Sequence, residues 1–171
     1  MRHVDAFLAE LDQEAACARK MFERVPEEKL SWRPHPKSFS LGQLALHVAS
    51  IPGGLASFAK EDTVEAPEFK QEEAASRERV LREFEESLVQ CRDILTALPG
   101  KAWEGPWTLT VGGTPTLTLP RASMLRSLLL NHFVHHRGVL SVYLRLLDVP
   151  VPSIYGPSAD ETPEFLAAAR G

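Results

Sequence analysis

Three of the six histidines of this 171-residue chain fall within five positions of one another, at 132, 135 and 136. On a helix, His132 and His136 project from the same face one turn apart, because they are four residues apart. This is the spacing by which one helix gives two imidazoles to a single metal ion. A third histidine, His47, follows Leu44 by three residues and precedes Ile51 by four, which places it at the border of another apolar helical face.

Two explanations compete for these histidines. Each could be a core side chain bonded to backbone or water, which is the better explanation for one isolated buried histidine. Three imidazoles in one core would each need a polar partner, however, and one divalent cation satisfies all three. We therefore predict a divalent metal ion held by His47, His132 and His136, with His135 in a supporting or packing role beside it.

A ligand set of three imidazoles suits zinc, nickel or another borderline divalent ion. Three protein ligands leave one coordination position open, as in catalytic zinc sites. Because the ligands are neutral, the charge of the ion would lower the pKa of a water or thiol in that position. Phe133 rather than Glu follows His132, so the chain does not carry the His-Glu-x-x-His motif of metalloproteases. Cys17 and Cys91 lie on or near apolar stripes, and we expect them to be structural.

Four segments with the apolar spacing of amphipathic helices must position these residues. They span about 3–25, 40–58, 72–97 and 121–148. Ser40 and Gln43 form a capping box at the start of the second segment. Pro52 lies inside this segment, and since the apolar stripe stays in phase across it, we predict a kink rather than an end. Four such helices predict an all-α fold, a four-helix bundle formed by a single domain over residues 1–171.

Smaller elements are predicted outside these helices. Between the third and fourth helix, residues 107–111 and 116–119 alternate around Gly112 and Gly113, which predicts a short hairpin or an extended loop. Near the C-terminus, residues 164–169 could form a short helix. Trp32 and Trp107 lie in the connections and could line the mouth of a pocket, although packing is the commoner role for both.

The composition excludes several classes of function. Lys and Arg number 19 and Asp and Glu 23, which gives a formal net charge of −4 without a basic block and argues against nucleic-acid binding. No apolar run approaches the ~18 residues of a membrane span, and the N-terminus lacks the apolar stretch of a signal peptide. The composition therefore predicts a cytoplasmic protein with neither nucleic-acid nor membrane partners.

Several stretches of the chain also follow the pattern of a known family. They are Trp-Arg-Pro at 32–34, Ser-Leu-Gly-Gln-Leu-Ala-Leu-His at 40–47, Asn-His-Phe-Val-His-His-Arg-Gly at 131–138, and the stretches 143–145 and 154–161. In them the chain resembles the DinB/YfiT-like family of metal-dependent hydrolases over nearly its whole length. The resemblance implies a four-helix bundle, often a homodimer, with metal ligands at His47, His132 and His136. One position departs from the pattern, because many members have Gln where this chain has Val139.

The resemblance leaves the activity open. Relatives with this fold include S-transferases and an isomerase that use low-molecular-weight thiols such as mycothiol, bacillithiol or glutathione, whereas the hydrolase name implies an activated water. The resemblance thus implies a metal-dependent enzyme, either a thiol S-transferase or a hydrolase, with a small-molecule substrate. The alternative is a non-catalytic, metal-binding bundle protein related to stress.

Overall fold

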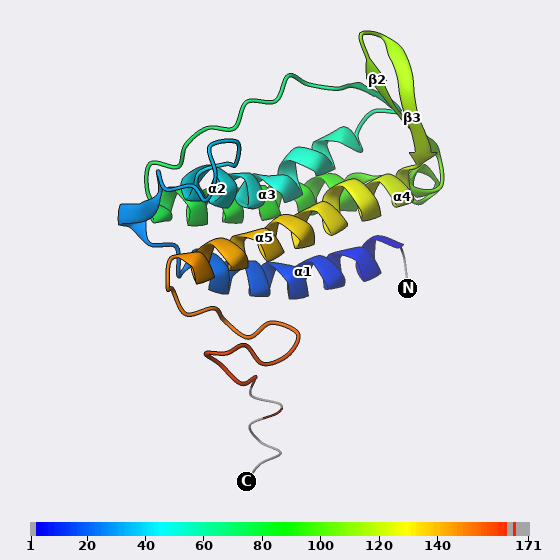
Figure 1. Ribbon diagram of the computed structural model, residues 1–171. Coiled ribbons are helices and arrows are strands. Elements are labelled where there is room, and N and C mark those ends of the chain that lie inside the picture. Colours follow the sequence, from blue (N-terminus) through cyan, green and yellow to red (C-terminus); the bar gives the residue numbers. More distant parts are fainter. Residues whose placement is uncertain (1–2, 164–165, 167–171) are drawn as a thin grey trace.

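The computed structural model describes residues 3–163 and residue 166, and it shows four long helical stretches packed around one core (Figure 1). The first three stretches are α1 (His3–Phe22), α2 (Leu41–Phe58) and α3 (Arg77–Ala97). The fourth consists of three consecutive segments, α4 (Arg121–Met124), the π-helical η3 (Leu125–Asn131) and α5 (His132–Leu146). Short 3-10 helices, η1 (Glu27–Lys29) and η2 (Gly100–Trp103), lie in the connections. Both α1 and α2 pack against α3 and α5.

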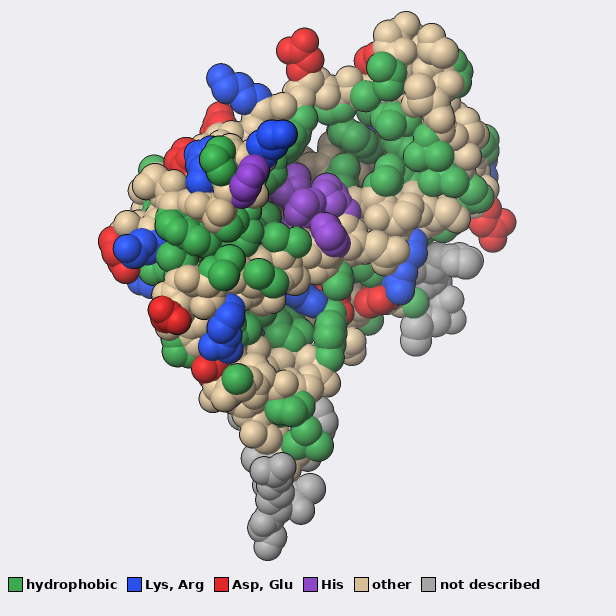
Figure 2. All heavy atoms as spheres, viewed as in Figure 1, with side chains coloured by type: hydrophobic (Ala, Val, Ile, Leu, Met, Phe, Trp, Pro, Cys, Tyr) green, Lys and Arg blue, Asp and Glu red, His purple; other side chains and the backbone are tan. Residues whose placement is uncertain are grey.

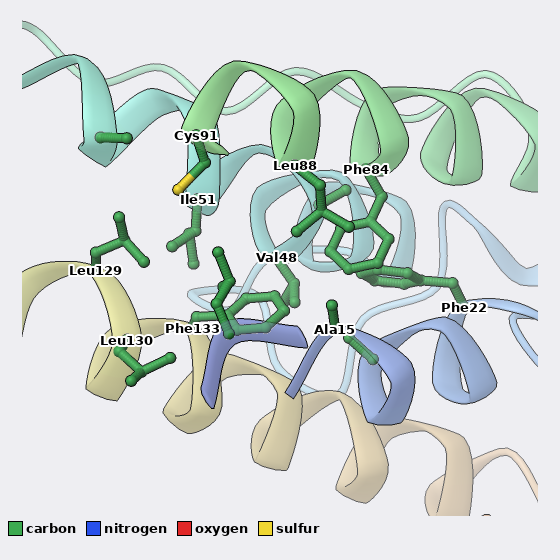
Figure 3. Close-up of a cluster of buried hydrophobic side chains, with 14 of the residues drawn as sticks. Ala15, Phe22, Val48, Ile51, Phe84, Leu88, Cys91, Leu129, Leu130 and Phe133 are labelled. Carbon is green, nitrogen blue, oxygen red and sulfur yellow. The ribbon is translucent and has the colours of Figure 1, made fainter. Parts of the chain in front are cut away.

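The core draws side chains from all four helical stretches (Figure 3). The ring of Phe84 on α3 lies 5.0 Å from that of Phe22 on α1 and 6.0 Å from that of Phe133 on α5, measured between centroids. Such aromatic contacts add to the stabilisation that burial alone provides. Cys91 is fully buried on the same face of α3, in keeping with the structural role expected for it.

The capping box at the start of α2 forms as the sequence predicts, and the helix does not end at its proline. The Ser40 hydroxyl accepts a hydrogen bond from the Gln43 N–H, and the Ser40 N–H donates to the Gln43 side chain, so the capping box is confirmed. The helix continues through Pro52 rather than ending there. At the next residue, the Gly53 N–H donates to Ser87 Oγ of α3 at 2.7 Å, and a Cβ on Gly53 would lie 2.9 Å from the Ser87 carbonyl oxygen. Glycine therefore allows α2 and α3 to approach closely beside the proline.

A three-stranded sheet, in the order β1-β2-β3, corrects the all-α prediction. Strands β2 (Pro106–Val111) and β3 (Thr114–Pro120) form the predicted hairpin, with positive φ at Gly112 and Gly113 in its turn. The sequence does not predict β1 (Thr63–Glu65), which pairs in parallel with β2, because three residues are too few to show a pattern. Its Glu65 carboxylate accepts hydrogen bonds from the N–H groups of both turn glycines, so tertiary contacts hold the strand in place.

The connection from β1 to α3 also differs from the prediction, because α3 begins at residue 77, capped by Ser76, and not at residue 72. The residues that precede Ser76 form hydrogen bonds with the start of α2 instead of continuing the helix. The Gln71 carbonyl accepts from the Gln43 side chain, and the Glu73 carboxylate accepts from the Ser40 hydroxyl. Residues 66–76, which we call the strap, therefore run without regular secondary structure from the sheet to the start of α3 (Figure 1).

Two further predictions concern a C-terminal helix and membrane-spanning segments. The short helix expected at 164–169 lies outside the described residues apart from Leu166. Of the helices that the structure describes, none has the length and apolar character to cross a membrane.

Candidate metal centre

His47 of α2 and the pair His132 and His136 of α5 meet where these two helices pack together. The Nε2 atoms of His47 and His132 are 3.4 Å apart, and one ligand nitrogen from each of the three side chains lies within 4.8 Å of the others. His47 is buried and the other two are half-buried. The structure thus brings together the three histidines that the sequence singles out, as a group that could hold a metal ion.

A hydrogen bond from the strap orients the His47 ring. Gln71 Nε2 donates to the Glu72 carbonyl at 3.3 Å, which leaves Gln71 Oε1 facing His47 Nδ1 at 3.2 Å. His47 therefore carries its proton on Nδ1 and presents the lone pair of Nε2 to His132. Sequence reasoning misses Gln71, because it lies 24 residues from His47 in a connection without a periodic pattern.

His132 is oriented by its own helix. It hydrogen-bonds to the backbone of Leu128, one turn earlier, while its Nε2 faces His47. Leu128 belongs to the π-helical η3, which ends directly before His132. A π-helical turn changes which side chains share a face, and such turns are frequent at functional sites. In this π-helical segment Leu129 and Leu130 are both buried, and the segment leads directly into the helix that carries His132 and His136.

All three histidines are neutral at physiological pH. Burial, together with the neighbouring His132, lowers the pKa of His47 to about 4. Burial and the neighbouring histidines lower the pKa of His136 to about 4 as well, and burial lowers that of His132. Two unprotonated nitrogens consequently face each other at 3.4 Å, which is an unfavourable arrangement of lone pairs without a positive charge between them. The donor set and its geometry therefore fit a divalent cation.

The histidines form part of the wall of a cavity of about 550 Å³. Figure 2 shows histidine side chains gathered beside a hollow with hydrophobic side chains around it. The other lining residues come from α2, from the strap and from the loop before α2, and they are largely apolar: Phe39, Ser50, Ile51, Gly54, Leu55, Phe58, Pro67 and Phe69. Ser50 is the one other polar side chain of this lining, and its hydroxyl donates to the His47 carbonyl at 3.0 Å. No charged side chain of the described residues lines the cavity.

The remaining residues that the sequence singles out lie away from the cavity lining. His135 is exposed beside His136, with 4.9 Å between ring centroids, and lines a different pocket on the α1 side. Trp32 packs edge-on against Tyr143, and the fully buried Trp107 donates from Nε1 to the Phe58 carbonyl at 2.9 Å. Both tryptophans therefore pack within the fold.

The two cysteines are free thiols outside the histidine cluster. Burial raises the pKa of Cys91 to about 12 and also raises that of the half-buried Cys17. A thiol with a raised pKa is a poor nucleophile at neutral pH, since the reactive form is the thiolate. Neither cysteine is placed to act on a ligand in the cavity.

The fold and the histidine cluster define a class of helical-bundle proteins with a candidate three-histidine metal site. A sequence profile described as the DinB superfamily matches residues 10–140, and the chain belongs to this superfamily. It is 26% identical over 163 residues to the uncharacterized protein YrdA of Bacillus subtilis (strain 168), an alignment that covers 95% of this chain and 93% of YrdA.

Two solved structures share the fold. A DinB-like protein from Bacillus cereus ATCC 10987 superimposes with a TM-score of 0.69 at 20% identity, covering 88% of this chain and 97% of that one. The DinB-like protein YjoA from Bacillus subtilis gives a TM-score of 0.66 at 18% identity, covering 87% and 97%. At these identities the likeness establishes the common architecture, mostly helical with four long helical stretches.

Proposed function

We propose that the protein is a metal-dependent enzyme in which His47, His132 and His136 hold one divalent ion, zinc or nickel. With an ion held there, a small thiol would be transferred as its thiolate to a small-molecule substrate in the adjoining cavity. The observation that carries this proposal is the pair of Nε2 atoms of His47 and His132, 3.4 Å apart, whose lone pairs face each other on the wall of the cavity. A divalent cation held there would replace this repulsive contact with two bonds to nitrogen.

Different residues of the chain orient the histidines and hold the substrate. Gln71 and the Leu128 backbone fix the rings of His47 and His132, so that the cluster is oriented before a ligand arrives. The apolar lining holds the body of the substrate and keeps water away from it. When bound, the ion supplies positive charge that favours the thiolate over the thiol.

The transfer step balances without a further reactant. The thiol first loses its proton to solvent, and the sulfur then uses its electron pair to form a bond to the electrophilic carbon of the substrate. The bond from that carbon to its leaving group breaks, and the leaving group takes the bonding pair. No redox change is involved.

The cavity lining favours a thiol over water as the nucleophile. Hydrolysis by water calls for a group that shuttles protons during attack and departure, and carboxylates or histidines free of metal usually serve as this group. None of the described lining residues outside the histidine cluster is titratable. A thiol ionises once, before attack, and needs no such group. The hydrolase function is the second candidate, and thiol dependence separates the two.

The test combines metal analysis with thiol titration. Wild-type protein and a His35→Ala control, altered at an exposed histidine of the η1–α2 connection, should each bind one zinc or nickel ion per chain. His132→Ala should lose this binding, with affinity reduced by more than about a hundredfold, because a ligand is removed rather than merely reoriented. Unchanged stoichiometry and affinity in His132→Ala would refute the site.

The nucleophile is identified with cobalt in the site. Glutathione or another small thiol should shift the visible spectrum of the cobalt protein and release a proton below the free thiol pKa of about 8.5. A pH-dependent spectrum near neutrality without any response to thiols would favour the hydrolase instead. A spectrum that responds to neither would overturn the enzymatic proposal in favour of a non-catalytic metal-binding protein.

We also propose a homodimer, as the family resemblance implies. Val142 and Leu146 support it, because they lie one turn apart on α5 and are 55% and 57% exposed. A stable interface should bury at least ~1,000 Å² in total. Light scattering at micromolar concentration should give twice the monomer mass, and Val142→Glu should reduce it. A monomer mass across the dilution range would contradict the proposal.

A further inference from the structure

The strap crosses the cavity and is anchored on both sides of it. At the sheet end, the Ala66 N–H donates to the Thr110 carbonyl at 2.8 Å. At the other end, the Gln71 carbonyl accepts from Gln43, and the Gln71 side chain bonds to His47. Figure 1 shows the strap running along the bundle between these ends. The residues between the two anchors are therefore held over the cavity without being buried in the core.

Phe69 lies between these anchors in an unusual setting. It lines the cavity, yet 63% of its side chain is exposed, the second-highest value among the large hydrophobic residues described as exposed. Its ring centroid is 5.3 Å from that of His47 and 6.3 Å from that of Phe39. An aromatic side chain that combines exposure with contact to a candidate metal ligand offers an apolar face to whatever enters the cavity.

The chemistry of the lining restricts the occupant. Three phenylalanines, Phe39, Phe58 and Phe69, contribute to a lining in which the described residues supply no Lys, Arg, Asp or Glu. An ionised group deep in this cavity would lose its hydration without gaining a partner. The volume of about 550 Å³ falls in the range of small-molecule sites. A neutral molecule with an apolar body therefore fits the cavity better than a charged one.

On the basis of the proposed metal-dependent function, we infer that the substrate is an uncharged electrophile with an aromatic or branched-alkyl body, and that Phe69 determines selectivity for this body. The electrophilic carbon lies at the histidine end of the cavity and the apolar body lies against the strap. Phe69 contacts the substrate away from the reacting atoms, so it acts on binding and not on the activation of the nucleophile.

The first experiment measures binding to metal-free protein with the uncharged fluorescent probe N-phenyl-1-naphthylamine. Wild-type protein should bind one probe per chain, and Phe69→Ala should weaken binding about tenfold because the exposed ring face is lost. Val89→Ala is the matched control, since Val89 is 59% exposed on α3 outside this cavity, and it should bind as wild type does. Phe69→Leu should restore most of the affinity.

Two more measurements locate the probe and test its charge. Leu55→Trp places a larger side chain in the lining and should block the probe, with circular dichroism used to verify that the variant is folded. The anionic probe 8-anilinonaphthalene-1-sulfonate should bind metal-free protein at least about tenfold more weakly than the neutral probe. Equal affinity in Phe69→Ala and Val89→Ala, or tighter binding of the anionic probe, would overturn the inference.

Because these measurements need no metal, their failure is distinguishable from failure of the proposed function. Loss of metal binding in the tests above would leave the probe results standing. Conversely, a confirmed metal site with no effect of Phe69→Ala on the probe would remove the selectivity inference alone. In the metal-loaded protein, Phe69→Ala should raise KM for an aryl electrophile about tenfold with little change in kcat, because Phe69 holds the body of the substrate.

Discussion

His136 and Arg137 are neighbours in the chain, yet they belong to two different polar clusters on different sides of α5. His136 faces α2 and belongs to the histidine cluster. Arg137, only 3% exposed, faces α1 and forms an ion pair with the Glu14 carboxylate. It also donates to the Glu14 carbonyl at 3.1 Å and to the Tyr155 hydroxyl at 2.5 Å. One turn of one helix therefore supplies polar side chains to two sites in the same bundle.

The two clusters differ in whether the protein itself supplies a donor for every acceptor. Around Arg137 donors meet acceptors, since the Tyr155 hydroxyl in turn donates to the Glu14 carboxylate at 2.6 Å. In the histidine cluster, His47 and His132 present acceptor to acceptor. A buried cluster in which charges and hydrogen bonds are matched needs nothing else. A cluster in which lone pairs face each other gains most from a cation, so we expect the first cluster to contribute stability and the second to bind a ligand.

The largest expected effect breaks the Arg137 cluster. Arg137→Ala should lower the free energy of unfolding by about 3–5 kcal/mol, because it leaves the Glu14 carboxylate buried without its counter-charge. Denaturant unfolding of the metal-free protein measures this change. In the fraction that remains folded, zinc stoichiometry should stay at one ion per chain.

Arg126→Ala is the matched control for this prediction. Arg126 also pairs with a carboxylate of α1, Glu10, but its side chain is 52% exposed. Its removal should cost no more than about 1 kcal/mol, as for other exposed ion pairs. Equal losses in the two variants would show that the Arg137 cluster is not a buried structural pair.

A smaller effect is expected from the strap side of the histidine cluster. Gln71→Leu keeps the approximate size of the side chain but removes the acceptor that orients His47. Zinc affinity should fall about 10–100-fold, the usual result of losing a hydrogen bond to a metal-ligating histidine. The free energy of unfolding should change by less than about 1 kcal/mol, since Gln71 is only half-buried and lies in the strap, outside the hydrophobic core. Competition with a chelator measures the affinity.

Gln13→Leu, at an exposed position of α1, controls for the substitution itself. Its zinc affinity should match that of wild type. If Gln71→Leu also matched wild type, His47 would owe its orientation to the packing of its neighbours and not to the strap. If Gln71→Leu instead unfolded the protein, the two clusters would not divide stability and binding as proposed.

The two clusters also show what the sequence can and cannot reveal. Periodicity predicts the long helices, and the spacing of His132 and His136 together with the position of His47 predicts the three histidines that the structure places side by side. Arg137 and Glu14 escape prediction because charged residues are usually exposed, and their pairing joins positions 123 residues apart. The role of Gln71 is also not predictable, because it depends on the path of the strap, an irregular connection, past His47.

The π-helical segment η3 marks a second limit. A stripe drawn with 3.6 residues per turn places Leu125, Leu129 and His132 on one face, and all three do lie toward the interior. The wider turn that buries Leu130 as well leaves no trace in that pattern. Likewise β1 depends on pairing with a strand more than forty residues away. Local patterns therefore predict which elements exist, and long-range contacts decide their details.

The smallest expected effect concerns the pH dependence of metal binding. Ions compete with protons for imidazole nitrogens, so the outcome depends on the pKa values in the metal-free folded protein. Three ordinary imidazoles with a pKa of about 6.5 would each be about nine-tenths protonated at pH 5.5, and zinc affinity would fall roughly a thousandfold from pH 7.5. Here the pKa of His47 and that of His136 are about 4, and that of His132 is also lowered.

The histidine cluster should therefore lose less than about tenfold in zinc affinity between pH 7.5 and 5.5. A flexible peptide with three histidines serves as the reference and should lose far more over the same interval. The same shifts act on stability, because the unfolded chain binds more protons than the folded one between pH 6.5 and 4. The free energy of unfolding of the metal-free protein should then decrease as the pH falls through this interval. A thousandfold loss of zinc affinity would mean that water reaches the three nitrogens freely. In that case the histidine cluster would not be shielded from water, and its facing lone pairs would cost little. The two clusters would then differ only in that the Arg137 cluster contains an ion pair.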